Sequence, residues 1–511
     1  MAKRNKGQVF LVGAGPGDER LVSAAALDCI RRADVLVYDY LIPPALLEYR
    51  KPGAVLICAG KSPGRRSMPQ DKINALLRAQ ALRGRTVARL KGGDPFLFGR
   101  GSEEALALAE AGIHFEIIPG VSSGFAVPAY AGIPLTHRGA ASQVTFVTGR
   151  EDPAKSVPDV EWARLAGQKG TLVIFMGMAG LKNITARLIT HGMPVNTPVC
   201  VVERGTLPAQ RSVTGTLASI GAAVKRGHIT HPALIIIGEV VRLRKKLNWY
   251  ESKPLFGKKI LITRPRSSAA ELSRALEREG ARTFIYPLIE IVREKYLDER
   301  RVLEKLRGSD WIIFTSANAV EICFDIMKKN RKDARLFAAA RIAVLGTGTE
   351  KELARRGVIA DVIPEKFMLE GLLRSFRGFD VKGKRIFIPH SRQGRPVLVR
   401  ALAGRGALVD EMFLYRVKPP REACRGELIK LIRRERFDAI TFTSSSCVRQ
   451  FMRLAGKAKK LLQRQTFAAI GPVTGQTLRE FGYPAAATAK VFTAEGLVQA
   501  VKKIKRKHIY D

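Results

Sequence analysis

The second half of this 511-residue chain repeats itself, and the repeat constrains the fold more than any other feature. Three segments recur in the same order, offset by 125 to 128 residues: 259–262 and 385–388, 310–320 and 438–448, and 342–346 and 467–471. Each contains a short apolar run, and the second and third pairs also include a serine or a glycine after it. The repeat predicts a duplicated α/β unit whose two lobes face each other across a cleft. Clefts near the carboxyl ends of strands are the usual place for a ligand.

The first half alternates short apolar runs with segments of helical spacing, a pattern typical of α/β domains. Helical spacing covers 20–32 and 70–83. The expected strands form two sets, 9–12, 35–38, 55–57 and 87–90, followed by 143–147, 171–175, 199–202 and 233–237. Two further α/β lobes are therefore expected within about 240 residues.

A basic segment containing Pro254 and Gly257 interrupts this pattern and indicates a junction between domains. The expected domains are 1–245, with lobes at about 7–138 and 142–242, and 258–505, with a linker at 246–257. The second domain is expected to consist of one lobe at 258–290 plus 418–505 and another at 291–417.

The net charge of +41 makes nucleic acid the usual first guess for a partner. The basic residues are spread along the chain, however, and no RNA-binding aromatic signature accompanies them. A small polyanion would be attracted equally well, so the charge alone does not identify the class of partner. We expect neither a nucleic-acid nor a membrane partner. The six scattered cysteines form no C-x-x-C pair, which is typical of reduced residues in a cytoplasmic protein. His228 and His231 have no cysteine or carboxylate cluster beside them, so we expect no metal.

A glycine-rich turn, Gly13-Ala-Gly-Pro-Gly17, follows the first expected strand. It lacks the third glycine of a dinucleotide fingerprint, and Pro16 removes an N–H group that could bind phosphate. A cofactor without phosphate, such as S-adenosylmethionine, suits the loop better than NAD, although a plain tight turn is an equal alternative. Further polar turns follow the strands at Asp39, Gly60-Lys61, 91–95, 119–123 and 134–138. Five such turns along one sheet indicate a site.

Together the segments VGAGPGD, ADVLVYD, GK, PQDKIN, RLKGGDPFLFGRG, PGVSS, YAGIPLTHR and VTFVTG resemble the uroporphyrinogen-III C-methyltransferases of the tetrapyrrole methylase family, over residues 7–250. The resemblance implies the two-lobed methylase fold, S-adenosyl-L-methionine as cofactor and a homodimer formed through this domain. It also implies that Asp39 is the proton acceptor and Lys61 the proton donor. The cofactor contacts implied by the family pattern are Pro16, Gly92, Gly93, Asp94, Leu97, Ser122, Ser123, Met176 and Gly205.

The residue types suit methyl transfer to a pyrrole carbon, which leaves positive charge on the ring until a proton is lost. Asp39 can stabilise that charge or accept the proton. Lys61 can supply a proton or, nearly as plausibly, pair with a substrate carboxylate. The substrate carries several carboxylates, and the candidate clamps are Arg89, Arg100, His137 and Arg138, whose alternative role is ordinary surface charge. Arg66 stands where the family usually has a histidine, which puts local substrate contacts in doubt.

Residues 258–501 are similar to uroporphyrinogen-III synthase, on the strength of the two-lobe repeat and the order of its segments. The turns Phe314-Thr-Ser316 and Phe442-Thr-Ser444 could bind carboxylates at helix N-termini, cap those helices, or do both. The resemblance implies cyclisation without metal or organic cofactor, with Tyr415 assisting loss of the hydroxyl; a packing role for Tyr415 is equally open. The candidate cleft contacts are Thr263, Arg264, Ser316, Thr443, Ser444 and Thr474.

The two resemblances predict a fused α/β enzyme. One half would cyclise hydroxymethylbilane to uroporphyrinogen III, and the other would methylate it twice to precorrin-2, toward sirohaem or cobalamin. The nearest alternative is a methyltransferase acting on a later corrin intermediate with a degenerate synthase half. No segment is left over for the dehydrogenase and ferrochelatase module of a sirohaem synthase. A basic RNA-binding protein is the alternative from a different class.

Overall fold

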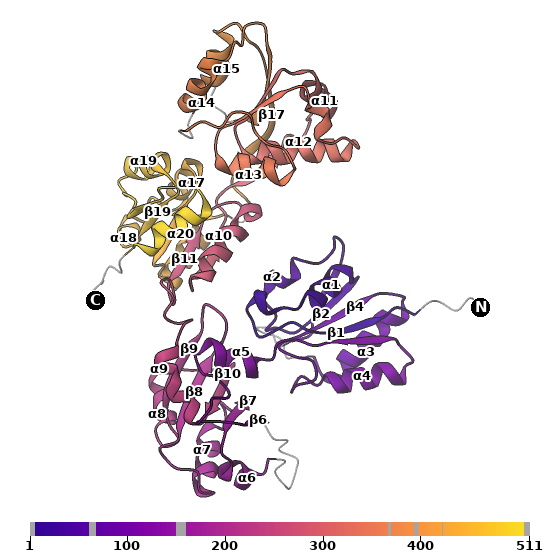
Figure 1. The fold of residues 1–511 in the computed structure, drawn as a ribbon, viewed down its shortest axis with the longest axis vertical. Helices are drawn as coiled ribbons and strands as arrows, with labels where there is room; N and C mark the ends of the chain where they lie inside the picture. The colour runs from indigo at the N-terminus through magenta and orange to yellow at the C-terminus, as the bar shows by residue number, and fades with distance from the viewer. Residues whose placement is uncertain are drawn as a thin grey trace, which may run out of the picture. The chain divides into compact units, whose positions relative to one another are not determined.

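The computed structural model describes residues 6–60, 68–149, 160–365, 369–392, 397–421 and 423–504. The chain forms two compact units, Met1–Gly257 and Lys258–Asp511, each with two five-stranded sheets (Figure 1). None of the described helices is long and apolar enough to cross a membrane.

The first sheet of the first unit is entirely parallel. Its strands run in the order β3 (Val55–Cys58), β2 (Val35–Tyr38), β4 (Val87–Lys91), β1 (Val9–Gly13) and β5 (Phe115–Ile118). Helix α1 (Ala24–Arg32) covers one face, and α3 (Gln70–Leu82) and α4 (Gly101–Glu110) cover the other. Because both faces are covered, the central strands are continuously apolar, which explains why the sequence pattern located them.

The strand order places a crevice at the carboxyl ends of β1 and β4. The chain leaves β1 through α1 toward β2, and it leaves β4 through α4 in the opposite direction, toward β5. Neighbouring strands whose connections diverge in this way open a crevice at the edge of the sheet, where α/β proteins bind ligands.

The second sheet of this unit is mixed, in the order β6 (Val144–Thr148), β7 (Thr171–Phe175), β10 (Ala233–Ile237), β8 (Pro198–Glu203) and β9 (Arg211–Thr216). Helices α6 (Trp162–Gly167), α7 (Leu181–Thr190) and α8 (Ile220–Arg226) cover one face. Helix α5 (Ser123–Tyr130), which follows the last strand of the first sheet, packs on the other face through Val127. Helix α5 therefore joins the two lobes beside the crevice.

Residues 246–257, which the sequence predicts as a linker, pack against the first unit. The buried ring of Tyr250 contacts those of Tyr130 and Phe256, with centroids 4.8 and 5.6 Å apart. The short elements of this unit are α2 (Pro44–Leu47), α9 (Arg244–Leu247), and the 3-10 helices η1 (Glu19–Leu21) and η2 (Glu239–Leu243).

The second unit confirms the duplication. Its sheets have the orders β12-β11-β18-β19-β20 and β13-β17-β16-β14-β15. The repeated strands are neighbours in both sheets and in the same order, as β11, β18, β19 and as β16, β14, β15. The strand bounds are β11 (Lys259–Ile262), β12 (Arg282–Ile285), β13 (Glu290–Arg293), β14 (Trp311–Phe314), β15 (Arg341–Val344), β16 (Arg385–Ser391), β17 (Leu408–Lys418), β18 (Ala439–Phe442), β19 (Phe467–Ala469) and β20 (Ala487–Thr488).

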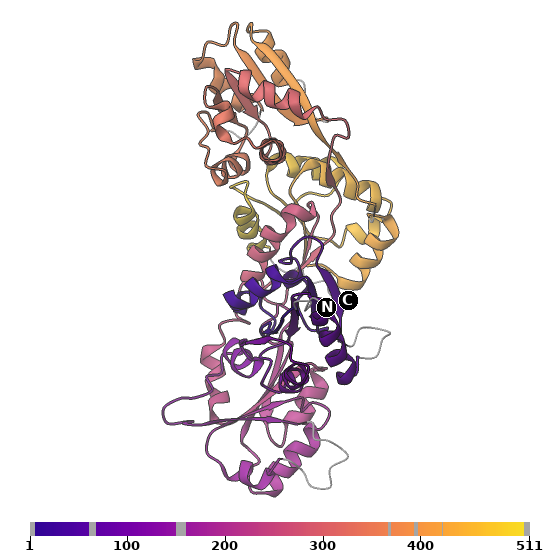
Figure 2. The same ribbon diagram turned by 90° about the vertical axis from the view of Figure 1, so that its right-hand side faces the viewer.

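The first of these sheets contains strands from both ends of the unit, because the chain crosses to the second sheet at β13 and returns after β17. The C-terminal helix α20 accordingly lies beside α10 at the start of the unit (Figures 1 and 2), and Lys502 Nζ is 3.1 Å from Glu279 Oε2. The helices are α10 (Arg266–Arg278), α11 (Glu299–Gly308), α12 (Ala317–Lys329), α13 (Thr347–Arg355), α14 (Leu369–Ser375), α15 (Val397–Ala403), α16 (Arg425–Glu435), α17 (Ser445–Ala455), α18 (Lys459–Leu462), α19 (Pro472–Glu480) and α20 (Ala494–Lys502), with η3 (Ala334–Phe337) and η4 (Phe376–Gly378).

Candidate functional site

Glycines bring three loops together at the crevice of the first unit. The Gly93 N–H donates to the Gly15 carbonyl at 2.7 Å, which ties the loop after β4 to the loop after β1. A Cβ on Gly120 would lie 2.2 Å from the Gly93 carbonyl oxygen and 2.7 Å from Gly13 Cα. Because backbone meets backbone here, a side chain on Gly120 would push these loops apart.

Asp94 holds two of these loops in register. One carboxylate oxygen accepts a hydrogen bond from the Phe96 N–H at 2.8 Å, and the other accepts one from the Gly120 N–H at 3.0 Å. The structure therefore gives Asp94 a role in shaping the crevice. Its predicted contact with a cofactor stays a prediction.

The start of helix α5 closes one side of the crevice. The buried Ser122 hydroxyl accepts a hydrogen bond from the Gly124 N–H at 3.1 Å and caps the helix. A Cβ on Gly93 would lie 3.6 Å from the Ser123 nitrogen, whereas a Cβ on Gly92 would have no atom within 4 Å. Gly92 is thus an exposed backbone position facing open space, next to a capped helix N-terminus.

The second lobe also contacts the crevice loops. The Thr206 hydroxyl accepts from the Asp18 N–H at 3.2 Å and lies 3.3 Å from the Pro16 carbonyl, so the loop after β1 is bonded to the second lobe. A Cβ on Gly205 would lie 2.5 Å from the Val127 side chain of α5. Glycine therefore lets this loop approach the helix closely.

Strained backbone gathers in the same loops. Five non-glycine residues there have a positive φ, between 49° and 70°: Phe98, Arg100, Met176, Arg204 and Thr206. Such conformations cost about 1–3 kcal/mol each and cluster at ligand-binding sites. Met176 follows β7 and is 49% exposed, and the preceding ring of Phe175 lies 5.0 Å from that of Phe98, which follows β4. The loop carrying the predicted contact Leu97, which is half-buried, therefore meets the loop carrying Met176.

Asp39 lies just past β2 and belongs to a network of buried charges. Its Oδ1 accepts a hydrogen bond from Arg89 Nη2 at 2.6 Å. Arg89 Nε donates to Glu104 Oε1 at 3.1 Å, and Lys91 Nζ donates to the same oxygen at 2.9 Å. Burial lowers the pKa of Lys91, and repulsion by Arg89 lowers it further, while the pairing with Glu104 opposes the shift. The Asp39 side chain remains 33% exposed, so it can still contact a ligand.

The location of Arg89 revises its predicted role as a substrate clamp. Its side chain is 2% exposed, and the guanidinium is already bound by Asp39 and Glu104. Glu104 was not among the predicted site residues. The sequence did contain a signal. Arg89 and Lys91 are two residues apart on a buried strand, so they point to the same face of the sheet. Two cations buried on one face require a countercharge from the helix that covers it.

The other predicted clamps differ in their surroundings. Arg100 is exposed and forms an ion pair with Glu103 at 2.7 Å. His137 and Arg138 are exposed in the turn that connects the two lobes. Lys61 and Arg66 lie outside the described residues.

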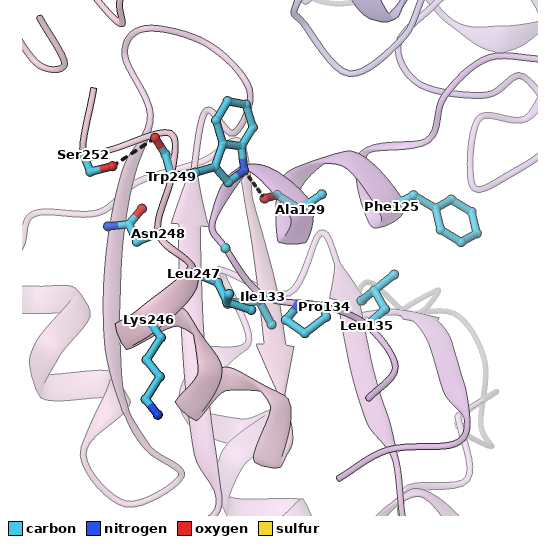
Figure 3. Close-up of a pocket in the computed structure, with 11 residues that line it drawn as sticks. Phe125, Ala129, Ile133, Pro134, Leu135, Lys246, Leu247, Asn248, Trp249 and Ser252 are labelled. Carbon is cyan, nitrogen blue, oxygen red and sulfur yellow. Dashed lines mark hydrogen bonds between the residues drawn. The ribbon is translucent and has the colours of Figure 1, made fainter. Parts of the chain in front are cut away.

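A mostly apolar pocket of about 710 Å³ lies beside the C-terminal end of α5 (Figure 3). The Trp249 indole N–H donates to the Ala129 carbonyl at 2.9 Å along its edge. Lys246 is the one ionisable residue among those lining the pocket. The groups suited to acid–base chemistry therefore lie at the glycine crevice and not in this pocket.

Two of the predicted cleft contacts in the first sheet of the second unit bond to their own sheet or helix. The buried Thr263 hydroxyl donates to the Thr441 carbonyl at 2.7 Å and so ties β11 to β18; its predicted role as a cleft contact stays a prediction. Burial lowers the pKa of Arg264, and its Nε donates to Ser268 Oγ at 3.0 Å. Thr474 is buried within α19, so it is poorly placed to contact a ligand.

The two repeated serines cap equivalent helices. Ser316 accepts from the Ala319 N–H at the start of α12, and Ser444 accepts from the Cys447 N–H at the start of α17, both at 3.2 Å. The Tyr415 hydroxyl is 2.8 Å from Ser316 Oγ, and the tyrosine is only 5% exposed. The capping interpretation is thus confirmed, and Thr443, which precedes Ser444, is half-buried at the end of β18.

Comparisons with known proteins match the two units to two families. Residues 8–221 match the tetrapyrrole (corrin/porphyrin) methylases, and residues 270–499 match uroporphyrinogen-III synthase HemD. A porphyrin biosynthesis protein HemD from Ruminiclostridium josui is 34% identical over 99% of both chains.

Two further relatives match a part of the chain. A uroporphyrinogen-III C-methyltransferase from Bacillus subtilis is 39% identical and covers 70% of this chain and 73% of its own. A sirohaem synthase from Azotobacter vinelandii is 47% identical over 49% of this chain and 54% of its own. The chain belongs to the tetrapyrrole methylases through its first half and to the uroporphyrinogen-III synthases through its second, as a fusion of the two.

Proposed function

We propose that this chain makes uroporphyrinogen III from hydroxymethylbilane and then methylates it twice to precorrin-2. The observation that carries the proposal is the partly exposed Asp39 carboxylate at the edge of a sheet whose glycine crevice has methylase motifs, in a chain that also contains the duplicated synthase unit. The product of one half is the substrate of the other, and tethering raises its local concentration.

The crevice fits S-adenosylmethionine. Gly92 faces open space, three glycines let the backbone approach closely, and Ser122 caps the adjoining α5 N-terminus. When bound, the cofactor supplies an electrophilic methyl group on a sulfonium. We retain Pro16, Gly92, Gly93, Asp94, Leu97, Ser122, Ser123, Met176 and Gly205 as its proposed contacts.

In methyl transfer, Asp39 is the group that meets the developing positive charge of the pyrrole ring. A carboxylate held by a buried guanidinium is oriented before the reaction begins, which favours the charged transition state. The same carboxylate can accept the proton that restores the ring. Lys61 stays our proposed donor or substrate clamp.

Substrate binding combines charge with apolar surface. The exposed Arg100, His137 and Arg138 remain the proposed partners of the substrate carboxylates. Phe96 and Phe125, 54% and 55% exposed, offer apolar surface near the crevice for the macrocycle.

In the synthase half, the proposed residues gather near the carboxyl ends of neighbouring strands in each sheet. Tyr415 lies inside β17, opposite Ser391 at the end of β16. Arg264 and the capped Ser444 follow β11 and β18 in one sheet, while Ser316 and Tyr415 pair in the other. Catalysis there rests on folding the linear substrate so that its ends meet.

The test is to supply hydroxymethylbilane anaerobically, with and without S-adenosylmethionine, and to identify the products. Uroporphyrinogen III is expected without the cofactor and precorrin-2 with it. Formation of the type I isomer alone would contradict the synthase assignment, and lack of methylated product would contradict the methyltransferase assignment. Asp39→Asn should slow only the methylation and leave cyclisation unchanged.

We further propose that the chain is cytoplasmic and forms a homodimer through the methyltransferase half. The chain mass is 56.2 kDa, so light scattering of the purified protein distinguishes a dimer from a monomer directly. The domain bounds 1–245 and 258–505 also remain proposals.

A further inference from the structure

The Asp39 carboxylate is the partly exposed end of a buried chain of charges that runs from β2 through β4 to α4. We infer that Glu104 and Arg89 are positioning residues that fix Asp39 for methyl transfer. This inference rests on the function proposed for the methyltransferase half. Lys91 completes the set, so that two cations face two carboxylates.

Glu104 is the anchor of this network. It is completely buried, and its Oε1 accepts hydrogen bonds from Arg89 Nε, Lys91 Nζ and Gln70 Nε2, at 3.1, 2.9 and 3.2 Å. Its other oxygen has no hydrogen-bond partner among the described residues. Burying a carboxylate this completely is unfavourable unless cations are placed against it. Here both cations, Arg89 and Lys91, contact the same oxygen, Oε1.

Arg89 carries the constraint from Glu104 to Asp39. Its planar guanidinium is bonded at three nitrogens: Nε to Glu104, Nη1 to the Leu90 carbonyl at 3.2 Å, and Nη2 to Asp39 Oδ1 at 2.6 Å. A guanidinium bonded at three of its nitrogens cannot rotate without breaking a hydrogen bond. The ammonium group of lysine cannot make three such bonds in one plane. Arg89 therefore fixes one oxygen of Asp39, while the other makes no hydrogen bond within the described structure and is available to a ligand.

Whether the Asp39 carboxylate is fixed or mobile should change kcat more than it changes substrate binding. Misplacing a reacting group by about 1 Å costs roughly 100-fold in rate. Arg89→Lys should therefore lower kcat for methylation by about 100-fold, with KM for uroporphyrinogen III and the affinity for S-adenosylhomocysteine changed less than about threefold. Glu104→Gln should act in the same direction, because it leaves Arg89 without its charged anchor.

The deciding experiment is a double-mutant cycle on the full chain, with uroporphyrinogen III supplied directly. Asp39→Asn, Arg89→Lys and the double variant are compared anaerobically for kcat, KM and binding of S-adenosylhomocysteine. If Arg89 acts through Asp39, the double variant is no slower than Asp39→Asn within about threefold. Arg85→Lys is the matched control, since Arg85 precedes the amino end of the same strand β4, opposite the crevice, and donates to Gln80 Oε1 at 3.0 Å, so its kcat should be unchanged.

Three results would overturn the inference. If the rate losses of the two single variants multiply in the double variant, Arg89 contacts the substrate directly. The same follows if Arg89→Lys raises KM while kcat stays constant. An unchanged kcat in Arg89→Lys would remove any role in the reaction. Should Arg89→Lys not fold, the same cycle is run with Glu104→Gln. The proposed function fails separately, if the wild-type chain yields no methylated product.

Discussion

Replacing Gly92 with alanine should separate cofactor binding from folding. A Cβ at Gly92 would have no atom within 4 Å, and the backbone φ lies outside the left-handed region. The free energy of unfolding should therefore change by less than about 0.5 kcal/mol. If the cofactor fills that open space, the added methyl group overlaps it, at a cost of about 1–3 kcal/mol. The dissociation constant should then rise roughly 5- to 150-fold.

The assay is calorimetric titration of Gly92→Ala with S-adenosylhomocysteine, alongside urea unfolding. Gly167→Ala is the control, because Gly167 at the end of α6 also has no atom within 4 Å of its added Cβ and is distant in sequence from the crevice loops. Cyclisation of hydroxymethylbilane should be unaffected in both variants. Wild-type affinity in Gly92→Ala would show that the cofactor does not lie over Gly92, and would refute the placement of the site.

Three other substitutions give sharp expectations. Gly120→Ala should lower the free energy of unfolding by about 1–3 kcal/mol in urea, because its Cβ would lie 2.2 Å from the Gly93 carbonyl; wild-type stability would contradict this packing. Burial and the hydrogen bond to Asp18 raise the pKa of Tyr130 to about 12, so the stability from its neutral hydroxyl is present below about pH 10 and lost as the pH rises through about 12. Tyr130→Phe should accordingly be less stable than wild type at about pH 8, by about 1 kcal/mol, and the difference in urea unfolding should shrink toward about pH 12; a constant difference would contradict it. Tyr415→Phe should slow cyclisation by about 100-fold without affecting methylation of supplied uroporphyrinogen III, and an unchanged cyclisation rate would leave Tyr415 a packing role.

Most of the strands that the sequence located are buried on both faces, although the edge strand β3 is largely exposed. All eight segments expected in the first half form strands, because continuous apolar runs such as β1 and β10 are recognisable without any tertiary information. Strands β5 (Phe115–Ile118) and β9 (Arg211–Thr216) were missed, and β9 shows why. It is a partly exposed edge strand with no apolar run, and its pairing with β8 depends on contacts that local sequence does not reveal.

The candidate site was predictable in its parts but not in its connections. The turns carrying Gly13, Asp39 and Gly93 follow strands, so their common location at one edge of the sheet could be inferred. That Gly120 packs against Gly13 could not, since more than a hundred residues separate them. The role of Arg89 depends on which helix covers its face of the sheet, and a basic residue in isolation resembles a surface charge.

The two lobes of the synthase unit have kept a common framework while their polar groups have diverged. Ser316 and Ser444 cap equivalent helices with the same hydrogen bond, but only Ser316 has a tyrosine hydroxyl within bonding distance among the described residues. The repeat also aligns Arg264 with His390, whose Nε2 is 3.0 Å from Glu411 Oε2, so one lobe places a half-buried cation where the other places an imidazole–carboxylate pair. Identical lobes would present the same groups to both ends of a linear tetrapyrrole. The proposed cyclisation inverts only the last ring and so must distinguish those ends, and the divergence falls at the carboxyl ends of the strands, where that discrimination is needed.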